Sequence, residues 1–163
     1  MLAAVLLSNQ FGYLAADAAV IKPASVKARG VEGQILIVDK ARGLNRKGVV
    51  VTVTGRNFDE RVGIYVALCV IPKKGQQPGP CGGGVDMDGS TSASKWISSN
   101  PPSYGVGLAK PFGFGGKFKV KLKINSKIGN KDCRKIRCAI TTRADHLQGD
   151  DRSADVFIPV TFK

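Results

Sequence analysis

Four lysines alternate with four apolar residues in the stretch Lys117-Phe118-Lys119-Val120-Lys121-Leu122-Lys123-Ile124. Successive side chains of a β-strand point to opposite faces of a sheet, so this period of two predicts a strand. The apolar side chains are expected to face a core and the lysines to form a row in solvent. This arrangement is typical of an antiparallel sheet that has one face in water.

The chain beyond residue 33 continues with the same period of two, and Gly or Pro residues separate the runs. Short runs rich in β-branched residues and bounded by turn residues are typical of strands. Seven strands in about 130 residues predict an all-β sandwich with Greek-key connections. Besides residues 117–124, the strands are expected at residues 34–39, 49–54, 63–70, 92–97, 136–143 and 155–162.

The length of 163 residues is enough for one hydrophobic core and too short for two domains with separate cores. Hydrophobic residues make up 43% and charged residues 23%, which excludes a chain that is disordered by composition. Because 25 Lys and Arg stand against 12 Asp and Glu, the formal net charge is +13. This excess favours anionic partners, namely acidic envelope polymers, lipid headgroups or nucleic acid, and charge alone does not choose among them.

Residues 1–19 are mostly small and apolar and resemble the hydrophobic part of an export signal. Ala16 and Ala18 form an Ala-x-Ala pattern of the kind that signal peptidase accepts, although no Lys or Arg precedes the apolar run. We therefore predict an export signal at residues 1–19, or a segment retained as an anchor or docking helix; the alternative is a buried N-terminal helix. A linker is expected at residues 20–32, and one β-sandwich domain at residues 33–163.

The four cysteines are an even number and fit an oxidising compartment, where disulfides form and persist. Pairing Cys69 with Cys81 and Cys133 with Cys138 closes two short loops and is the simplest of three connectivities. Zinc is a poorer explanation, because neither spacing gives a Cys-x-x-Cys knuckle. We therefore expect disulfides in an exported protein.

Several of these segments together resemble the neocarzinostatin family: Gly63–Cys69, the loop closed by Cys81, the strand that follows Gly116, and Asp132-Cys133-x4-Cys138-Ala139-Ile140. The resemblance implies an immunoglobulin-like, seven-stranded sandwich with two local disulfides. The stretch from Cys138 to Val160 is also similar to the closing segment of related domains in exported actinobacterial envelope proteins. Some of those domains are attached to haem-acquisition surface modules, and most have no assigned reaction. The resemblance therefore implies a fold and an exported location more than an activity.

Antibiotic-carrying members of that family hold an enediyne chromophore in a cleft between the sheet and the loops. Aromatic and small residues near the cysteine loops line this cleft. Ile71 stands where counting from Cys69 places a cleft aromatic, and Ala139 follows the last cysteine, where the family has a polar cleft residue. Because this chain does not reproduce the lining, the resemblance does not carry chromophore binding over to it.

Catalysis has few residues to work with, because His146 is the only histidine of the chain. Every serine would need this one imidazole for a nucleophilic triad, and the glycines at 82–84 precede no phosphate-loop pattern. We predict no enzyme, no cofactor and no metal site. The acidic residues around His146 match no calcium loop, and we expect charge pairs there, with Arg143 and Arg152 facing Asp145, Asp150, Asp151 or Asp155.

The strongest electrostatic feature is the lysine row Lys117, Lys119, Lys121 and Lys123. Side chains about 6.5 to 7 Å apart on one strand face roughly match the charges along a polyanion. We assign these lysines to the binding of anionic lipid or wall polymer. The competing interpretation is a solvated sheet edge, where lysines discourage edge-to-edge association. Nucleic acid is not expected as a partner, because the aromatic platforms that it favours lie in a different segment.

The long connection at residues 81–116 carries the only tryptophan of the chain, and connections of this length in a compact domain are often functional. Its aromatic side chains are either a lid that binds a partner or a cover for one open end of the sandwich. We assign to partner binding Trp96, Tyr104, Phe112 and Phe114.

Together these features predict an exported, non-catalytic protein at the extracellular face of the cell envelope. It is expected to act as an interaction module or as an accessory subunit of a membrane or surface assembly. The expected partners are a protein of that assembly and an anionic lipid or wall polymer. The alternative function is a small-molecule carrier that binds haem or an antibiotic chromophore in the sandwich cleft.

Overall fold

The computed structural model describes residues 24–83 and 92–163, so the predicted export or anchor segment at residues 1–19 lies outside the described residues. None of the helices in the described part is long and apolar enough to cross a membrane. The elements of the described residues are β1 (Val26–Arg29), β2 (Ile35–Val38), β3 (Val49–Arg56), β4 (Ile64–Val70), β5 (Ser94–Ile97), the 3-10 helix η1 (Ser103–Gly105), β6 (Phe118–Ile124), β7 (Lys127–Ile128), β8 (Lys131–Asp132), β9 (Cys138–Ala144) and β10 (Val156–Val160).

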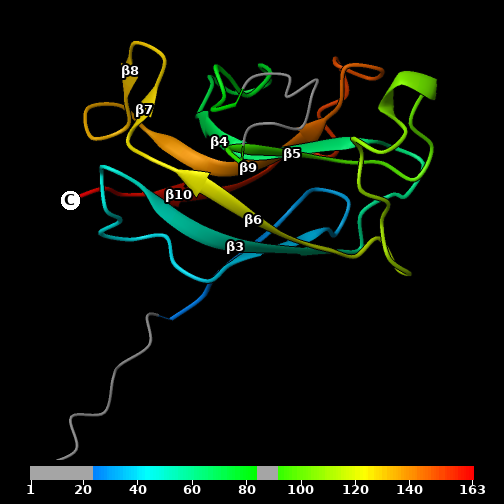
Figure 1. Cartoon of the computed structure of the whole chain (residues 1–163), viewed down its shortest axis with the longest axis horizontal. Helices are drawn as coiled ribbons and strands as arrows, with labels where there is room; N and C mark the ends of the chain where they lie inside the picture. Colours follow the sequence, from blue (N-terminus) through cyan, green and yellow to red (C-terminus); the bar gives the residue numbers. More distant parts are fainter. Residues whose placement is uncertain (1–23, 84–91) are drawn as a thin grey trace, which may run out of the picture.

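Two antiparallel sheets form the two layers of the molecule (Figure 1). The first sheet has the strand order β1-β2-β3-β6, the second has the order β10-β9-β4-β5, and β7 pairs with β8 in a small ribbon at one end. The chain changes sheets between β3 and β4, between β5 and β6, and between β6 and β9. The predicted all-β sandwich is confirmed, and each of the seven expected strands has a counterpart in one of the two sheets.

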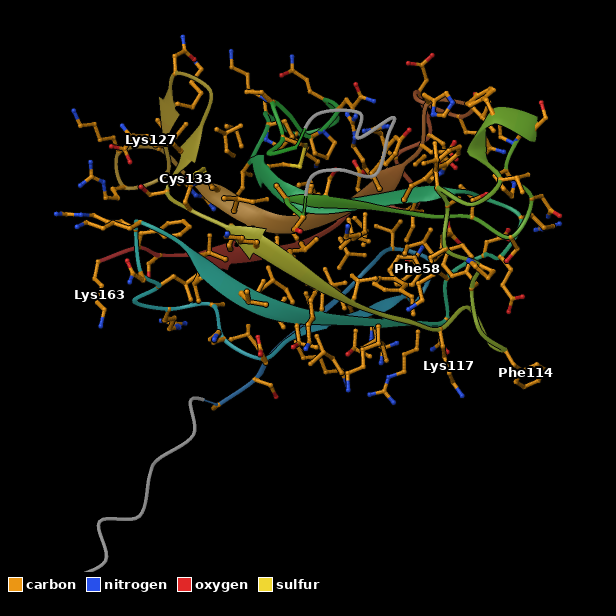
Figure 2. All side chains as sticks on the ribbon, in the orientation of Figure 1. Phe58, Phe114, Lys117, Lys127, Cys133 and Lys163 are labelled. Atoms are coloured by element: carbon orange, nitrogen blue, oxygen red, sulfur yellow. A yellow bond between two sulfur atoms is a disulfide. The ribbon has the colours of Figure 1, made fainter. Side chains whose placement is uncertain are left out.

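The core lies between the sheets, where alternate residues of the strands meet. In β6 the residues Phe118, Val120, Leu122 and Ile124 are buried and the lysines between them are exposed, as the period of two predicts. Burial of one such aliphatic or aromatic side chain contributes about 1.5–3 kcal/mol relative to leaving it in water. Figure 2 shows Phe58 between the two layers, at the end where the connection from β5 returns to β6.

Strand β1 lies within the range 20–32, which the sequence assigned to a linker. It pairs with β2 from Val26↔Val38 to Arg29↔Ile35, and Val26 and Ala28 pack against the core. The linker prediction is therefore wrong for residues 26–29. Two inward-facing apolar residues are enough to add an edge strand once β2 supplies hydrogen-bond partners.

Both locally paired disulfides are confirmed. Cys69 and Cys81 are 12 residues apart and have Cα atoms 4.0 Å apart, whereas Cys133 and Cys138 are 5 residues apart with a Cα separation of 5.5 Å. The first bond ties the loop after β4 back to that strand. The second fastens the loop after the β7-β8 ribbon to the start of β9.

Candidate functional site

Strand β6 presents the predicted lysine row to solvent. Burial alternates along the strand, so Lys119, Lys121 and Lys123 are exposed, and Lys117 is exposed just ahead of it. Figure 2 shows Lys117 on the side of the first sheet that faces away from the second sheet. Neighbouring side chains on one face of a strand are about 6.5 to 7 Å apart. The row is therefore a regular series of positive charges.

Cross-strand pairing adds cations from other strands to the same surface. One row of paired residues crosses all four strands and consists of Lys27, Ile37, Thr54 and Lys119. The next row contains Arg29, Ile35 and Arg56. We call the surface that these cations share the basic face, and its exposed members are Lys27, Arg29, Arg56, Lys117, Lys119, Lys121 and Lys123.

The strands of the first sheet all belong to the described residues and contain no Asp or Glu. Glu32 and Asp39 flank β2, and Asp39 Oδ1 accepts a hydrogen bond from the Thr52 backbone N–H at 2.9 Å. Like charges that face each other across strands destabilise a sheet slightly. An anion that binds among these cations relieves that repulsion, so the basic face is suited to attract polyanions.

Two of the aromatic residues predicted to bind a partner lie in opposite environments. Phe112 is 8% exposed and packs against Phe58 and Phe118, where it closes one end of the sandwich. Phe114 is 92% exposed in the turn before Lys117 and points away from the molecule (Figure 2). Phe112 is therefore part of the core, which agrees with the interpretation that this connection covers one open end of the sandwich. Phe114, in contrast, is open to contact with a partner.

Trp96 and Tyr104 belong to a polar cluster around His146. Tyr65 Oη lies 2.6 Å from His146 Nδ1, and Tyr104 Oη lies 2.6 Å from Nε2. Trp96 Nε1 donates to Asp145 Oδ2 at 2.9 Å, and the Trp96 and Tyr104 rings stack with centroids 6.4 Å apart. The four predicted aromatic residues are thus not brought together in one lid.

Sequence reasoning missed this cluster, because Tyr65 and His146 are 81 residues apart. They meet because β4 and β9 pair with the register Ile64↔Ala144, which no local pattern reveals. Burial, together with the nearby Asp145 charge, raises the pKa of Tyr65 to about 12, so its phenol stays neutral. Both ring nitrogens of His146 face tyrosine hydroxyls, so the three side chains form one hydrogen-bond network.

The loop after β9 is charge-paired in part. Arg152 pairs with Asp155 at 3.2 Å, which confirms one of the expected pairs. Arg143 takes a different position, with its guanidinium 5.8 Å from the centre of the Tyr65 ring and a hydrogen bond of 3.1 Å to the Pro78 carbonyl. Burial raises the pKa of Asp155 to about 6.

Among residues 24–83 and 92–163, no group of three or more His, Cys, Asp or Glu residues is placed to hold a metal ion.

The two positions that the family resemblance marks for a cleft continue the pairing of β4 with β9. Ala139 is fully buried opposite Cys69, and the Ile71 N–H donates to the Arg137 carbonyl at 3.0 Å. A cavity of about 220 Å³ lies beside Ile71 and also touches Phe157. Small-molecule sites typically measure about 300–1,000 Å³, so this cavity is smaller than most of them.

No protein-family model matches the chain, and no curated protein matches its sequence significantly. Among solved structures, the chain is similar to macromomycin, with a TM-score of 0.51 and 17% sequence identity. The match covers 80% of this chain and 100% of that chain. At this identity the likeness concerns the fold, and macromomycin is a protein of the neocarzinostatin family. This chain therefore has a neocarzinostatin-like fold.

Proposed function

We propose that this chain is an exported, non-catalytic protein of the cell envelope that binds an anionic partner through its basic face. It acts there as an interaction module or as an accessory subunit of a membrane or surface assembly. Two disulfides support export, because such bonds form and persist outside the reducing cytosol. The hydrogen bonds of both His146 ring nitrogens to tyrosines support a non-catalytic role.

The observation that carries the proposal is the one-sided charge of the first sheet. Its outer surface bears lysines and arginines from β1, β3 and the β6 region, and its strands contribute no carboxylate in the described chain. A polymer or membrane with many negative charges contacts several of these cations at once. Each contact is weak and screened by salt, but the contacts add.

Protection of a sheet edge does not account for the whole basic face. It explains the lysines of β6, because β6 is an edge strand of the first sheet. It does not explain Arg56, the last residue of the inner strand β3, which pairs with Ile35 of β2 and faces the same surface. The cations therefore extend across the sheet, as a binding surface requires.

The test compares two variants that lose the same four positive charges. The first replaces the lysine row by glutamine, at Lys117, Lys119, Lys121 and Lys123. The second replaces four exposed lysines outside the basic face, at Lys73, Lys74, Lys131 and Lys135. Binding to vesicles that contain anionic phospholipid and to purified anionic wall polymer is measured by cosedimentation.

We expect the first variant to lose at least about tenfold in affinity for one of the two targets, because several phosphate or carboxylate contacts disappear together. The second variant is expected to stay within about threefold of the original chain, since it keeps the basic face and loses only net charge. Equal losses in both variants, or no binding of the original chain to either target, contradict the proposal.

A second candidate function is that of a carrier for haem or an antibiotic chromophore in the sandwich cleft. The likeness of the fold to macromomycin favours it. Protein purified from native cell envelopes is then expected to show a visible absorbance band that follows the protein through gel filtration. Colourless protein from that source contradicts the carrier function.

A further inference from the structure

A groove of about 720 Å³ lies over the outer surface of β3 and β6, beside the segment at residues 110–113 that leads toward β6. Its volume falls within the range of about 300–1,000 Å³ that is typical of small-molecule sites. Its apolar lining consists of Ile37 and Pro111 together with the small exposed parts of Phe112 and Phe118, which are 8% and 5% exposed and otherwise belong to the core. The groove therefore offers an apolar floor on a surface that is otherwise strongly charged.

Hydrogen bonds within the protein hold the walls of this groove in place. The Gly113 N–H donates to the Lys117 carbonyl at 2.7 Å, and the Lys117 N–H donates to the Gly113 carbonyl at 2.9 Å. Lys110 Nζ donates to the Lys119 carbonyl at 3.1 Å, and the Lys110 N–H bonds to a carbonyl of β5. Because the walls are fastened to two strands, a ligand has little of the protein left to order.

The charged side chains around the groove are all positive. They are Arg56, Lys110, Lys117 and Lys119, and the described residues that line it include no Asp or Glu. An apolar floor with a positively charged rim complements a molecule that has one apolar part and one negatively charged head group. Carboxylates and phosphates form their strongest hydrogen bonds with such cationic donors.

We infer that this groove binds one molecule of a long-chain carboxylate, a fatty acid or a similar anionic amphiphile. The alkyl chain lies along the apolar floor, and the carboxylate lies among the lysine and arginine heads at the rim. The site is on the outside of the first sheet, whereas Ala139 lies in the second sheet and Ile71 lies directly beside it. It goes beyond the proposed function, which uses the charges of the basic face and does not need the apolar floor.

The test is a calorimetric titration of the full chain with dodecanoate below its micelle concentration. We expect saturable binding of one dodecanoate per protein. Butyrate has the same carboxylate but eight fewer methylene groups, and it is expected to bind at least about a hundredfold more weakly. Binding of several dodecanoate molecules without saturation overturns the inference.

The lysine row supplies a matched pair of variants. Lys117→Gln with Lys119→Gln removes two cations that line the groove, whereas Lys121→Gln with Lys123→Gln removes two cations of the same row that do not. The first pair is expected to weaken dodecanoate binding by about tenfold and the second by less than about twofold. Equal weakening by the two pairs shows a response to net charge alone and overturns the site.

Two substitutions test the apolar floor. Ile37→Ser removes apolar surface and is expected to weaken dodecanoate binding by about fivefold or more. Thr54→Trp fills the groove from β3 and is expected to abolish binding, which keeps the test decisive if Ile37→Ser fails to fold. Full binding by a folded Thr54→Trp variant overturns the inference.

Cosedimentation with anionic polymer separates the two proposals. It is expected to fall to the same extent in both lysine pairs and to stay unchanged in Ile37→Ser, because polymer binding depends on charge alone. If the original chain binds polymer but not dodecanoate, the groove is refuted and the proposed function stands. If it binds dodecanoate but no anionic polymer or vesicle, the proposed function is refuted and the groove stands.

Discussion

Gly116 lies where the turn before β6 passes the backbone of Phe58. Its φ is +59°, in the left-handed region, and a Cβ at this position would collide with the Phe58 backbone. The Gly116 N–H donates to Glu60 Oε1 at 2.8 Å, which fixes the turn from the other side. This one glycine therefore determines how closely the turn that carries Phe114 and Lys117 approaches the sandwich.

Gly116→Ala is expected to lower the free energy of unfolding by about 3 kcal/mol or more, because a left-handed alanine is strained and the Phe58 backbone must shift. Gly115→Ala is the matched control. Gly115 also has a positive φ, +77°, but the nearest atom to a Cβ there is Lys117 Cε at 3.8 Å, so about 1 kcal/mol is expected. Urea unfolding measures both losses, and equal losses contradict the role given to the Phe58 contact.

Asp155 is a carboxyl group that folding makes harder to ionise. Its side chain is 9% exposed, and its Oδ1 has no hydrogen-bond partner among the described residues. Burial raises its pKa from 3.8 to about 6, against the opposing effect of Arg152. The folded state thus holds this proton more tightly than the unfolded state. The resulting stabilisation is complete below about pH 4 and is lost as the pH rises through about 6.

Asp155→Asn is expected to remove this pH dependence. The free energy of unfolding of the original chain should fall relative to that of the variant between pH 4 and 6, by at most about 3 kcal/mol. Urea unfolding at a series of pH values measures both free energies. In the difference between the original chain and the variant, the contributions of all other titrating groups cancel. Parallel curves for the original chain and Asp155→Asn refute the pKa shift.

Strands β6 and β1 differ in how far their sequences reveal them. The alternation of lysines with Phe118, Val120, Leu122 and Ile124 predicted β6 with nearly its observed bounds. Every second side chain of this strand faces the core, so the pattern marks the strand along its whole length. β1 has only Val26 and Ala28 to bury, and such a short pattern occurs by chance in many loops. Its existence depends on pairing with β2, which the segment itself does not show.

For the candidate site, too, local patterns could be predicted and cross-strand contacts could not. The lysine row lies on one strand and could be predicted from the sequence of that strand. The contribution of Lys27 and Arg56 depends on the register of β1, β2 and β3, and the contacts of His146 depend on the register of β4 with β9. Such registers join residues far apart in the sequence, so local periodicity does not contain them.

The two disulfides are elements whose contributions to stability should differ. In the chain-entropy description, a cross-link over 12 residues restricts the unfolded chain more than one over 5 residues. Replacing Cys69 and Cys81 by alanine is expected to cost roughly 3 kcal/mol, and replacing Cys133 and Cys138 roughly 2 kcal/mol. Denaturant unfolding of the two double variants gives the order. A larger loss for the shorter loop shows that packing of the half-cystines outweighs loop closure.

At the scale of the whole molecule, the net charge of +13 is distributed unevenly. The first sheet carries the basic face, whereas four acidic residues gather in the loop between β9 and β10, namely Asp145, Asp150, Asp151 and Asp155. The molecule is therefore expected to orient its first sheet toward an anionic surface. β1, the first strand of the described chain, is an edge strand of that same sheet (Figure 1).

The most direct test of the central claim is a map of backbone amide chemical shifts in the labelled protein during titration with purified anionic wall polymer or anionic vesicles. We predict that the shift changes concentrate on β1, β3 and β6 and shrink as salt is added, because exposed charges are screened. The amides of η1 and β10 should remain unchanged. Changes that concentrate around His146 and η1 instead, or that spread evenly over both sheets, contradict binding through the basic face.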